Sequence, residues 1–226
     1  MYNKFNIKYL ESIFQLALDN GYEFLGLENF YNLKKPSKKF VLRLDIEFQP
    51  HSLESFLELS KKYKVPLVIY VRVSGPYNLL WYNTYKYLKQ AKDQGHEIGL
   101  HTTPLEWAKI LNNDPEIIFD SEIKLLNSFF DVKSISTHRD LNYAYNSLPW
   151  IEDNWDKLKK KYNLKYHAYE KKLFDNVHYV NEGFKPHLTW RNKTPEECIE
   201  SGESIYMLLH PHWWFKNFPF EHEYSL

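Results

Sequence analysis

The sequence predicts an α/β fold in which a parallel sheet curls into a distorted or incomplete (β/α)7 barrel. About seven short apolar stretches alternate with helical patterns along the chain, and strands that alternate with helices form parallel sheets. Four of these stretches end in a histidine or a carboxylate, and ligands of parallel α/β folds bind at such strand ends. The chain has 7 glycines and neither a GxGxxG motif nor a P-loop, which disfavours an open nucleotide-binding sheet.

The first half of the chain alternates regularly between the two patterns. Residues 5–18 have apolar side chains at helical spacing, and Gly21 follows as a C-cap. Ser52 is expected to cap the next helix, whose glutamates lie near its start and whose lysines lie near its end, as the helix dipole favours. The predicted helices of this half cover 5–18, 53–63 and 79–94, and the predicted strands cover 40–47, 65–73 and 97–101.

The second half continues the alternation. The helix predicted over 114–130 begins with Asp114 as N-cap and Pro115 at the first helical position. Another helix is expected near 153–162, and Thr194 and Glu197 have the spacing of a capping box at the start of the last one. The remaining strands are predicted over 133–138, 164–169, 177–180 and 204–210.

Length and composition predict one domain of 226 residues, with a helical segment over 1–38, the barrel over 39–215 and a tail over 216–226. Because 29 basic residues balance 29 acidic ones, no overall field attracts nucleic acid, and we expect no nucleic-acid partner. Aromatic residues make up 18% of the chain, which gives weak support to a carbohydrate ligand because Tyr and Trp stack on sugar rings.

The chain has one cysteine, Cys198, so no internal disulfide is possible. The N-terminal residues lack the continuous apolar core of a signal peptide, and no apolar run reaches the roughly 18 residues that span a bilayer. We therefore expect a cytoplasmic protein without a membrane span. The pattern predicts no oligomeric state.

Five strand-end residues are expected to converge on one pocket: Asp45, Glu47, His101, His138 and His210. Asp45 and Glu47 lie two apart, so they point to the same face of their strand. Carboxylates and imidazoles together suit zinc or another divalent first-row metal. The alternatives are that Arg43 and a lysine neutralise the acids as surface charges, and that the histidines are structural.

A metal at this pocket would serve hydrolysis of an amide or an ester, since it supplies a nucleophilic water and polarises the carbonyl. A nearby carboxylate would accept the proton of the water, and a histidine would protonate the leaving amine. The sequence has no GxSxG motif, and Cys198 lies inside a predicted helix, so a covalent nucleophile is not expected.

Four further residues are candidates for substrate binding: Arg139, Glu182, Trp213 and Trp214. Arg139 can bind a carboxylate or phosphate with two hydrogen bonds, or it can form an ion pair with Asp140. The two tryptophans are expected either to form a stacking wall or to pack in the core. His96 precedes its strand and is expected at the opposite end of the sheet.

The motifs RLDIE (43–47), GHEIGLH (95–101), STHR (136–139) and HPHWW (210–214) occur in an order that resembles the polysaccharide deacetylase superfamily, also called the NodB-homology domain or carbohydrate esterase family four. The resemblance covers about residues 1–215. It is closer to the deacetylase-like proteins of capsule and O-antigen gene clusters. The resemblance implies a distorted, NodB-like β/α barrel and a divalent metal, usually zinc.

The resemblance also implies roles for individual residues. Asp45 and Glu47 share the base and ligand roles, for which we take Asp45 as the catalytic base and Glu47 as the ligand. His101 is then a ligand and His210 the catalytic acid. The usual second histidine, four residues after the first, is missing here, where Leu105 stands, so we take His138 as the replacement ligand in preference to Glu106. Two further departures are Leu44, where the closer relatives have His, and Glu47, where they have Asp.

From these residues we expect a metal-dependent hydrolase that removes an acetyl-like N-acyl group from a sugar during surface-polysaccharide biosynthesis. The substrate would be a carbohydrate or a nucleotide-linked sugar. Two alternatives remain open: a catalytically inactive barrel that binds a sugar or a partner, and a metal-dependent amidase that acts on a small non-sugar substrate.

Overall fold

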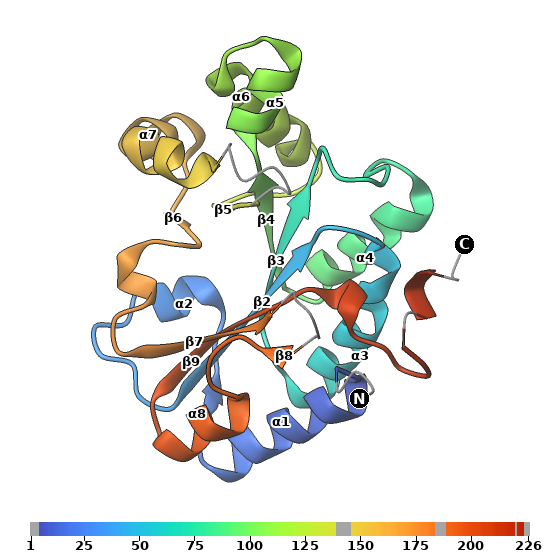
Figure 1. Ribbon diagram of the computed structural model, residues 1–226, viewed down its shortest axis with the longest axis vertical. Coiled ribbons are helices and arrows are strands. Elements are labelled where there is room, and N and C mark those ends of the chain that lie inside the picture. Colours follow the sequence, from blue (N-terminus) through green and yellow to red (C-terminus); the bar gives the residue numbers. More distant parts are fainter. Residues whose placement is uncertain (1–4, 139–145, 184–188, 220, 224–226) are drawn as a thin grey trace.

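The protein is a mixed α/β molecule built on one strongly curled sheet (Figure 1). The computed structural model describes residues 5–138, 146–183, 189–219 and 221–223. The strands run in the order β6-β5-β4-β3-β2-β9-β7-β8, and β1 also pairs with β2. Among these described strands no pairing joins β6 to β8, so the sheet they form is an open, partial barrel.

The strands are parallel except for the last pair, β7 and β8, which is antiparallel. Each of the seven predicted strands overlaps a strand of the sheet, and β1 and β8 are short additions. Their bounds are β1 Glu23–Phe24, β2 Lys39–Ile46, β3 Leu67–Arg72, β4 Glu97–Thr102, β5 Ser134–Thr137, β6 Tyr166–His167, β7 Val177–Gly183, β8 Thr189–Trp190 and β9 Ser204–Leu209.

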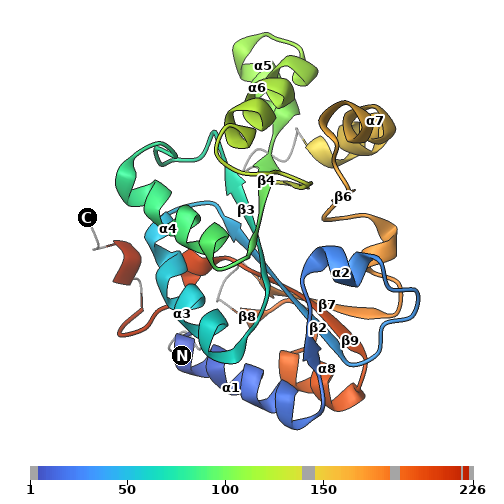
Figure 2. The same ribbon diagram turned by 180° about the vertical axis from the view of Figure 1, so that it is seen from behind.

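Most of the helices cover the outside of the curled sheet, as the views from both sides show (Figures 1 and 2). The α-helices are α1 Ile7–Asp19, α2 Leu27–Tyr31, α3 Leu53–Tyr63, α4 Tyr82–Asp93, α5 Pro104–Leu111, α6 Pro115–Asn127, α7 Ser147–Tyr162 and α8 Pro195–Ser201. Four 3-10 turns complete the described structure: η1 Pro50–Ser52, η2 Lys171–Leu173, η3 Pro211–Trp213 and η4 Glu221–Glu223. No helix in the described part of the chain is both long and apolar enough to cross a membrane.

Strand β2 shows how the sequence separates the two faces of the sheet. Leu42, Leu44 and Ile46 belong to the large outer core, in which the helices pack. Because side chains alternate along a strand, Arg43 and Asp45 point to the inner face instead. The inner face has its own small core, which includes Tyr70, Tyr166 and Tyr206 and is therefore rich in hydroxyl groups.

The ring of Tyr70 lies over Gly99 on β4 and leaves no room for a side chain there. A Cβ atom at this position would lie 2.6 Å from Cδ1 of Tyr70 and 2.9 Å from the backbone oxygen of Ser134. Both distances are well below van der Waals contact, so the glycine in the segment GHEIGLH is required by packing on the inner face.

The helices differ from the prediction at one cap, at one helix start and in two additional short helices. Ser52 lies in η1 with helical backbone angles and makes no capping hydrogen bond, because the chain begins to coil before it. Helix α7 begins at Ser147 rather than near 153, since the side chain of Asn146 accepts from the backbone N–H of Leu148 and caps it there. Helices α2 and α5 were not predicted, and both are short.

Two predicted caps and one predicted charge pattern are present. Asp114 accepts a hydrogen bond from the N–H of Glu116, with Pro115 next in sequence. Thr194 and Glu197 form a reciprocal capping box at the start of α8. Lys61 and Lys62 lie in the last turn of α3, where a cation complements the helix dipole.

Candidate metal and catalytic site

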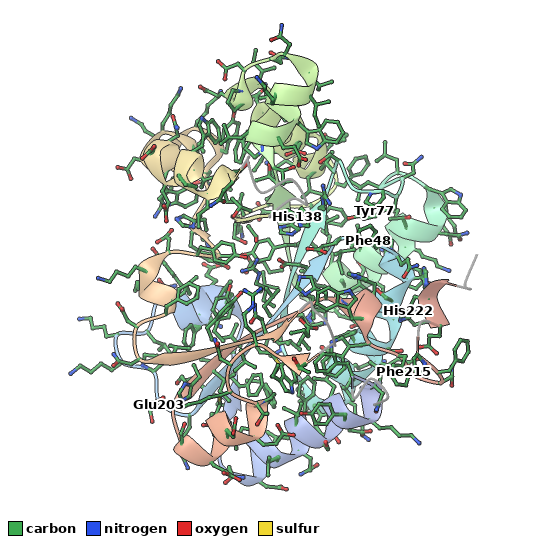
Figure 3. The ribbon with its side chains drawn as sticks, in the orientation of Figure 1. Phe48, Tyr77, His138, Glu203, Phe215 and His222 are labelled. Carbon is green, nitrogen blue, oxygen red and sulfur yellow. The ribbon has the colours of Figure 1, made fainter. Side chains whose placement is uncertain are left out.

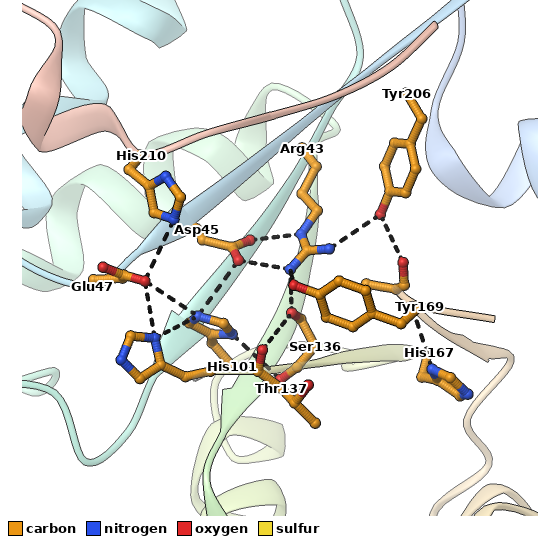
Figure 4. Close-up of polar contacts among 12 residues, drawn as sticks. Arg43, Asp45, Glu47, His101, Ser136, Thr137, His167, Tyr169, Tyr206 and His210 are labelled. Atoms are coloured by element: carbon orange, nitrogen blue, oxygen red, sulfur yellow. Dashed lines mark hydrogen bonds and ion pairs between the residues drawn. The ribbon is translucent and has the colours of Figure 1, made fainter. Parts of the chain in front are cut away.

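The carboxyl ends of four strands bring the predicted site residues together on the inner side of the sheet (Figure 4). Glu47 follows β2, His101 lies in β4, His138 follows β5 and His210 follows β9. These four strands lie within one continuous parallel run of the sheet, so the side chains that leave their ends reach the same place.

Glu47, His101 and His138 form a group that can hold a metal ion. One ligand atom from each lies within 4.8 Å of the other two. Nδ1 of His138 is 2.9 Å from Oε1 of Glu47 and 3.2 Å from Nε2 of His101. These are the three residues that the sequence predicted as ligands, and one carboxylate with two imidazoles is a common donor set for catalytic zinc.

The ring of His101 is oriented by the backbone. Its Nδ1 atom is 3.3 Å from the carbonyl oxygen of Ser136, on the neighbouring strand β5. A carbonyl oxygen only accepts, so Nδ1 donates in this contact, and Nε2, which lies 3.2 Å from Nδ1 of His138, is the ring atom that faces the ligand group. In histidines that bind metals, a hydrogen bond from the other ring nitrogen to a carbonyl or carboxylate fixes the tautomer.

Glu47 is held as a carboxylate by the histidines around it. Burial alone would raise its pKa, but contacts with His101, His138 and His210 outweigh burial and lower the pKa well below its usual range. Burial lowers the pKa of His138 and Glu47 opposes that shift, with a net decrease. The group is therefore one anionic oxygen donor beside a neutral imidazole, the protonation state that a metal requires.

His210 lies beside this group and is held in place by Glu182. One oxygen of Glu182 accepts from the backbone N–H of His210 at 3.0 Å and from Nε1 of Trp214 at 2.7 Å. The other oxygen is 3.0 Å from Nδ1 of His210. Nε2 of His210 then points toward Glu47, at 3.4 Å from its Oε1. Burial would lower the pKa of His210, yet Glu182 and Glu47 raise it well above its usual value.

Asp45 is a buried carboxylate, and Arg43 engages both of its oxygens. Nε and Nη2 of Arg43 donate to the two oxygens at 2.8 and 2.7 Å. The guanidinium is itself fully buried, lies 5.1 and 4.6 Å from the ring centres of Tyr70 and Tyr169, and also donates to Ser136. Burial raises the pKa of Asp45, but Arg43 and then His101 lower it, so the carboxylate stays ionised.

Asp45 therefore differs from the free strand-end acid that the sequence suggested. The Oδ2 atom of Asp45 is 3.5 Å from Nε2 of His101, so Asp45 lies directly beside the candidate ligand group. The alternative in which Arg43 neutralises the acids is realised for Asp45, although inside the sheet and not on the surface. Sequence reasoning missed the burial of this pair, although Arg43 is two residues before Asp45 and so shares its face.

The predicted substrate-binding residues are placed differently from one another. Trp213 is half-buried and its ring centre lies 4.4 Å from that of His210, so it borders the site. Trp214 is 1% exposed and packs in the outer core, which is the second of the two predicted environments. Glu182 is buried and binds His210 and Trp214, so it supports the site from behind and does not line its mouth. Arg139 lies outside the described residues.

His96 lies at the opposite end of the sheet, as predicted. It directly precedes β4, and its ring contacts Oγ of Ser60 and the backbone N–H of Leu67. Burial lowers its pKa to about 4. It therefore serves as a neutral hydrogen-bonding group between β3, β4 and α3, remote from the candidate metal site.

No model of a known protein family matches the sequence, and no curated protein matches it. Among solved structures, the chain is similar to a mutant of a CE4 family pseudoenzyme with restored enzymatic activity, at 12% sequence identity and a TM-score of 0.40. The similarity covers 80% of this chain and 57% of that one, so the chain spans a little over half the length of that protein. A likeness of this degree carries no argument about function, which depends on the site itself.

Proposed function

We propose that the protein is a metal-dependent hydrolase that removes an acetyl-like N-acyl group from a sugar. The observation that carries the proposal is the placement of three ligand atoms of Glu47, His101 and His138 within 4.8 Å of one another, next to a histidine that a buried glutamate holds. A sugar substrate, free or nucleotide-linked, and a place in surface-polysaccharide biosynthesis rest on the order of the four sequence motifs.

Each part of the site has a task in this reaction. A divalent ion, with zinc expected, would polarise the acyl carbonyl and lower the pKa of a water molecule when bound there. His210 is suited to donate a proton from Nε2 to the leaving amine, because Glu182 fixes its ring and favours its protonated form. Trp213 would exclude water from one side of the bound sugar.

Asp45 is the proposed proton acceptor for the water, but its pairing with Arg43 weakens it as a base. A carboxylate with both oxygens on a guanidinium accepts a proton less readily. In this arrangement Oδ2 of Asp45 lies 3.5 Å from Nε2 of His101, so Asp45 would mainly add negative charge beside a bound cation. The same pairing favours a second candidate function, an inactive barrel that binds a sugar or a partner without turnover.

Zinc content and hydrolysis measured on the same preparations test the proposal. The wild-type chain, loaded with zinc, should release acetate from N-acetylated sugar oligomers or nucleotide-linked N-acetyl sugars. His101→Ala should lose both metal and turnover, whereas Glu182→Gln should keep the metal and lose most turnover. The control His178→Ala alters a histidine that contacts Ser201 and Glu203, away from the site, and should retain both.

The outcomes separate the candidates. Bound zinc and sugar binding without acetate release would favour the inactive barrel. Release of acyl groups from small amides but from no sugar would favour the amidase. If His101→Ala retained both its zinc and its hydrolysis, the site described here would not be the active site.

A further inference from the structure

Tyr169 brings a further strand end to the candidate site, and none of the sequence motifs contains it. It follows β6, which ends at His167, and β6 is the neighbour of β5 in the sheet. In the orientation of Figure 3, Phe48 and Tyr77 lie on one side of His138, and β6 lies on its other side in Figure 1. Tyr169 therefore approaches the site from the side opposite to the connections that follow β2 and β3.

The side chain of Tyr169 is half-buried and contacts two neighbouring side chains. Its ring centre lies 4.6 Å from the guanidinium carbon of Arg43 and 6.5 Å from the ring of Phe174, to which it is almost parallel at 9°. Its hydroxyl oxygen accepts from Nη2 of Arg43 at 3.0 Å. Figure 4 shows this hydroxyl pointing toward Arg43 and the carboxylate of Asp45. The ring and its hydroxyl are thus held in one orientation beside the buried ion pair.

The hydroxyl hydrogen of Tyr169 has no acceptor in the described part of the chain, since the only hydrogen bond that this hydroxyl makes there is the one that it accepts. Nη2 of Arg43 has two hydrogens, but three oxygens lie within hydrogen-bonding distance of it, those of Asp45, Ser136 and Tyr169. The same Nη2 is 2.7 Å from Oδ2 of Asp45, which is 3.5 Å from Nε2 of His101. One guanidinium nitrogen therefore separates an available O–H donor from the acid beside the candidate ligand group.

Hydrolysis of an amide creates negative charge on the acyl oxygen. The water oxygen bonds to the acyl carbon, so the electron pair of the carbonyl double bond moves onto its oxygen and returns when the bond to nitrogen breaks. A fixed donor at that place lowers the barrier, because the charge is absent from the planar substrate. His210, the proposed proton donor for the leaving amine, and Tyr169 lie on opposite sides of Asp45 in Figure 4. An amide whose nitrogen faces His210 can therefore turn its acyl oxygen toward Tyr169.

We propose that Tyr169 is a catalytic residue, whose hydroxyl donates a hydrogen bond to the acyl oxygen of the substrate as negative charge develops on it. The proposal rests on the proposed hydrolysis of an N-acyl group and adds one residue to it. Arg43 strengthens the donor, since a cation that donates to a hydroxyl oxygen polarises its O–H bond. The hydroxyl keeps its proton throughout, so the products remain the amine, protonated by His210, and the carboxylate.

Kinetics and ligand binding of Tyr169→Phe test the proposal, because this change removes only the hydroxyl. On the N-acetylated sugar that the zinc-loaded wild type hydrolyses best, Tyr169→Phe should lower kcat about a hundredfold and leave KM almost unchanged. The second probe is the methylphosphonamidate of glucosamine, whose phosphorus has the tetrahedral geometry and the anionic oxygen of the reacting acyl group. Tyr169→Phe should bind it about a hundredfold more weakly in calorimetry, and should bind planar N-acetylglucosamine as the wild type does.

Tyr179→Phe is the matched control. Tyr179 is also half-buried against the inner core, with its ring 5.1 and 5.6 Å from those of Phe174 and Tyr206. Within the described residues its hydroxyl makes no hydrogen bond with Arg43, whose tyrosine partners are Tyr169 and Tyr206. This variant should keep the kcat and the analogue affinity of the wild type. Both variants should keep their zinc and melt within about 3 °C of the wild type, as intact folds would.

The results distinguish the role of Tyr169 from the hydrolysis itself. A wild type that hydrolyses the sugar while Tyr169→Phe keeps its kcat would overturn the role of Tyr169 and leave the hydrolysis standing. A raised KM at constant kcat would overturn it too, because the hydroxyl would then bind the planar substrate and the charged state alike. A wild type that releases acetate from no sugar would refute the hydrolysis. Analogue binding then decides on Tyr169, since equal affinities of the wild type and Tyr169→Phe, or no binding by either, would overturn its role.

Discussion

Arg43 offers the sharpest test of how the inner face of the sheet is stabilised. It is buried at 0% exposure, and the replacement Arg43→Met keeps much of the length and apolar volume of its side chain while it removes the charge. Asp45, which is 2% exposed, would then keep a negative charge with neither of the two guanidinium hydrogen bonds at 2.8 and 2.7 Å.

The expected cost follows from this geometry. Removal of one partner from a buried ion pair destabilises a protein by about 3–5 kcal/mol, because the remaining charge is unpaired in a medium of low polarity. Ser136 and Tyr169 also lose a donor, but hydroxyl groups rotate and find other partners more easily. We therefore expect Arg43→Met to lower the free energy of unfolding by about 4 kcal/mol, a large share of the 5–15 kcal/mol typical of a domain.

A double-mutant cycle isolates the pair. Urea unfolding of metal-free protein at neutral pH is measured for Arg43→Met, Asp45→Asn and the combined variant. Asp45→Asn alone leaves the buried guanidinium unpaired and should also cost several kcal/mol, whereas the combined variant carries no buried charge here. We expect the combined loss to be smaller than the sum of the single losses by about 2–3 kcal/mol. A single loss below about 1 kcal/mol, or additive losses, would refute the reasoning.

The same pair has a pH signature. The folded protein lowers the pKa of Asp45, because Arg43 and His101 outweigh burial. The folded state therefore binds fewer protons at this group than the unfolded chain, so the stabilisation is complete above the ordinary Asp pKa of about 3.9 and is lost as the pH falls through the folded-state value. Asp45→Asn should remove this part of the acid dependence.

The remaining predictions concern the metal group and the packing around it. His138→Ala should reduce bound zinc by at least about tenfold, whereas His212→Ala should retain it, as metal analysis by mass spectrometry would show. Glu47→Asp should weaken zinc about tenfold in titration calorimetry, because its oxygen retreats by one methylene. Gly99→Ala should destabilise by about 2 kcal/mol in urea, since its Cβ would lie 2.6 Å from a tyrosine ring carbon. Burial lowers the pKa of His96 to about 4, so stability should fall by about 2 kcal/mol between pH 6.5 and 4, and His96→Gln should flatten that fall.

The strands could be predicted because their cause is local. Buried parallel strands are rich in apolar residues, and β3 and β9 have nearly continuous apolar runs. The order of strands in the sheet depends on long-range packing. That β9 pairs with β2 and that β7 lies outside β9 follows from no local pattern. The start of α7 was missed for a similar reason, since an Asn at residue 146 is only one of several possible caps before 153.

That the residues of the candidate site lie close together could be predicted, because the carboxyl ends of parallel strands lie at the same edge of a sheet. Their individual environments could not. The sequence shows that Asp45 and Glu47 share a face, but only the fold shows that Arg43 and two tyrosine rings enclose the first and three histidines surround the second. Two carboxylates on one face of one strand thus have different partners: a guanidinium for Asp45 and imidazoles for Glu47.

The two departures from the expected metal motif, Glu47 and the absent histidine at Leu105, are related through the geometry. A histidine four residues after His101 would approach from α5, whereas His138 approaches from the end of β5, farther along the sheet from β2. A carboxylate on β2 must then reach farther to share an ion with it. The longer side chain of Glu47 does so, since its Oε1 is 2.9 Å from Nδ1 of His138. We propose that the glutamate and the histidine after β5 form one alternative donor arrangement, in which each replacement would account for the other.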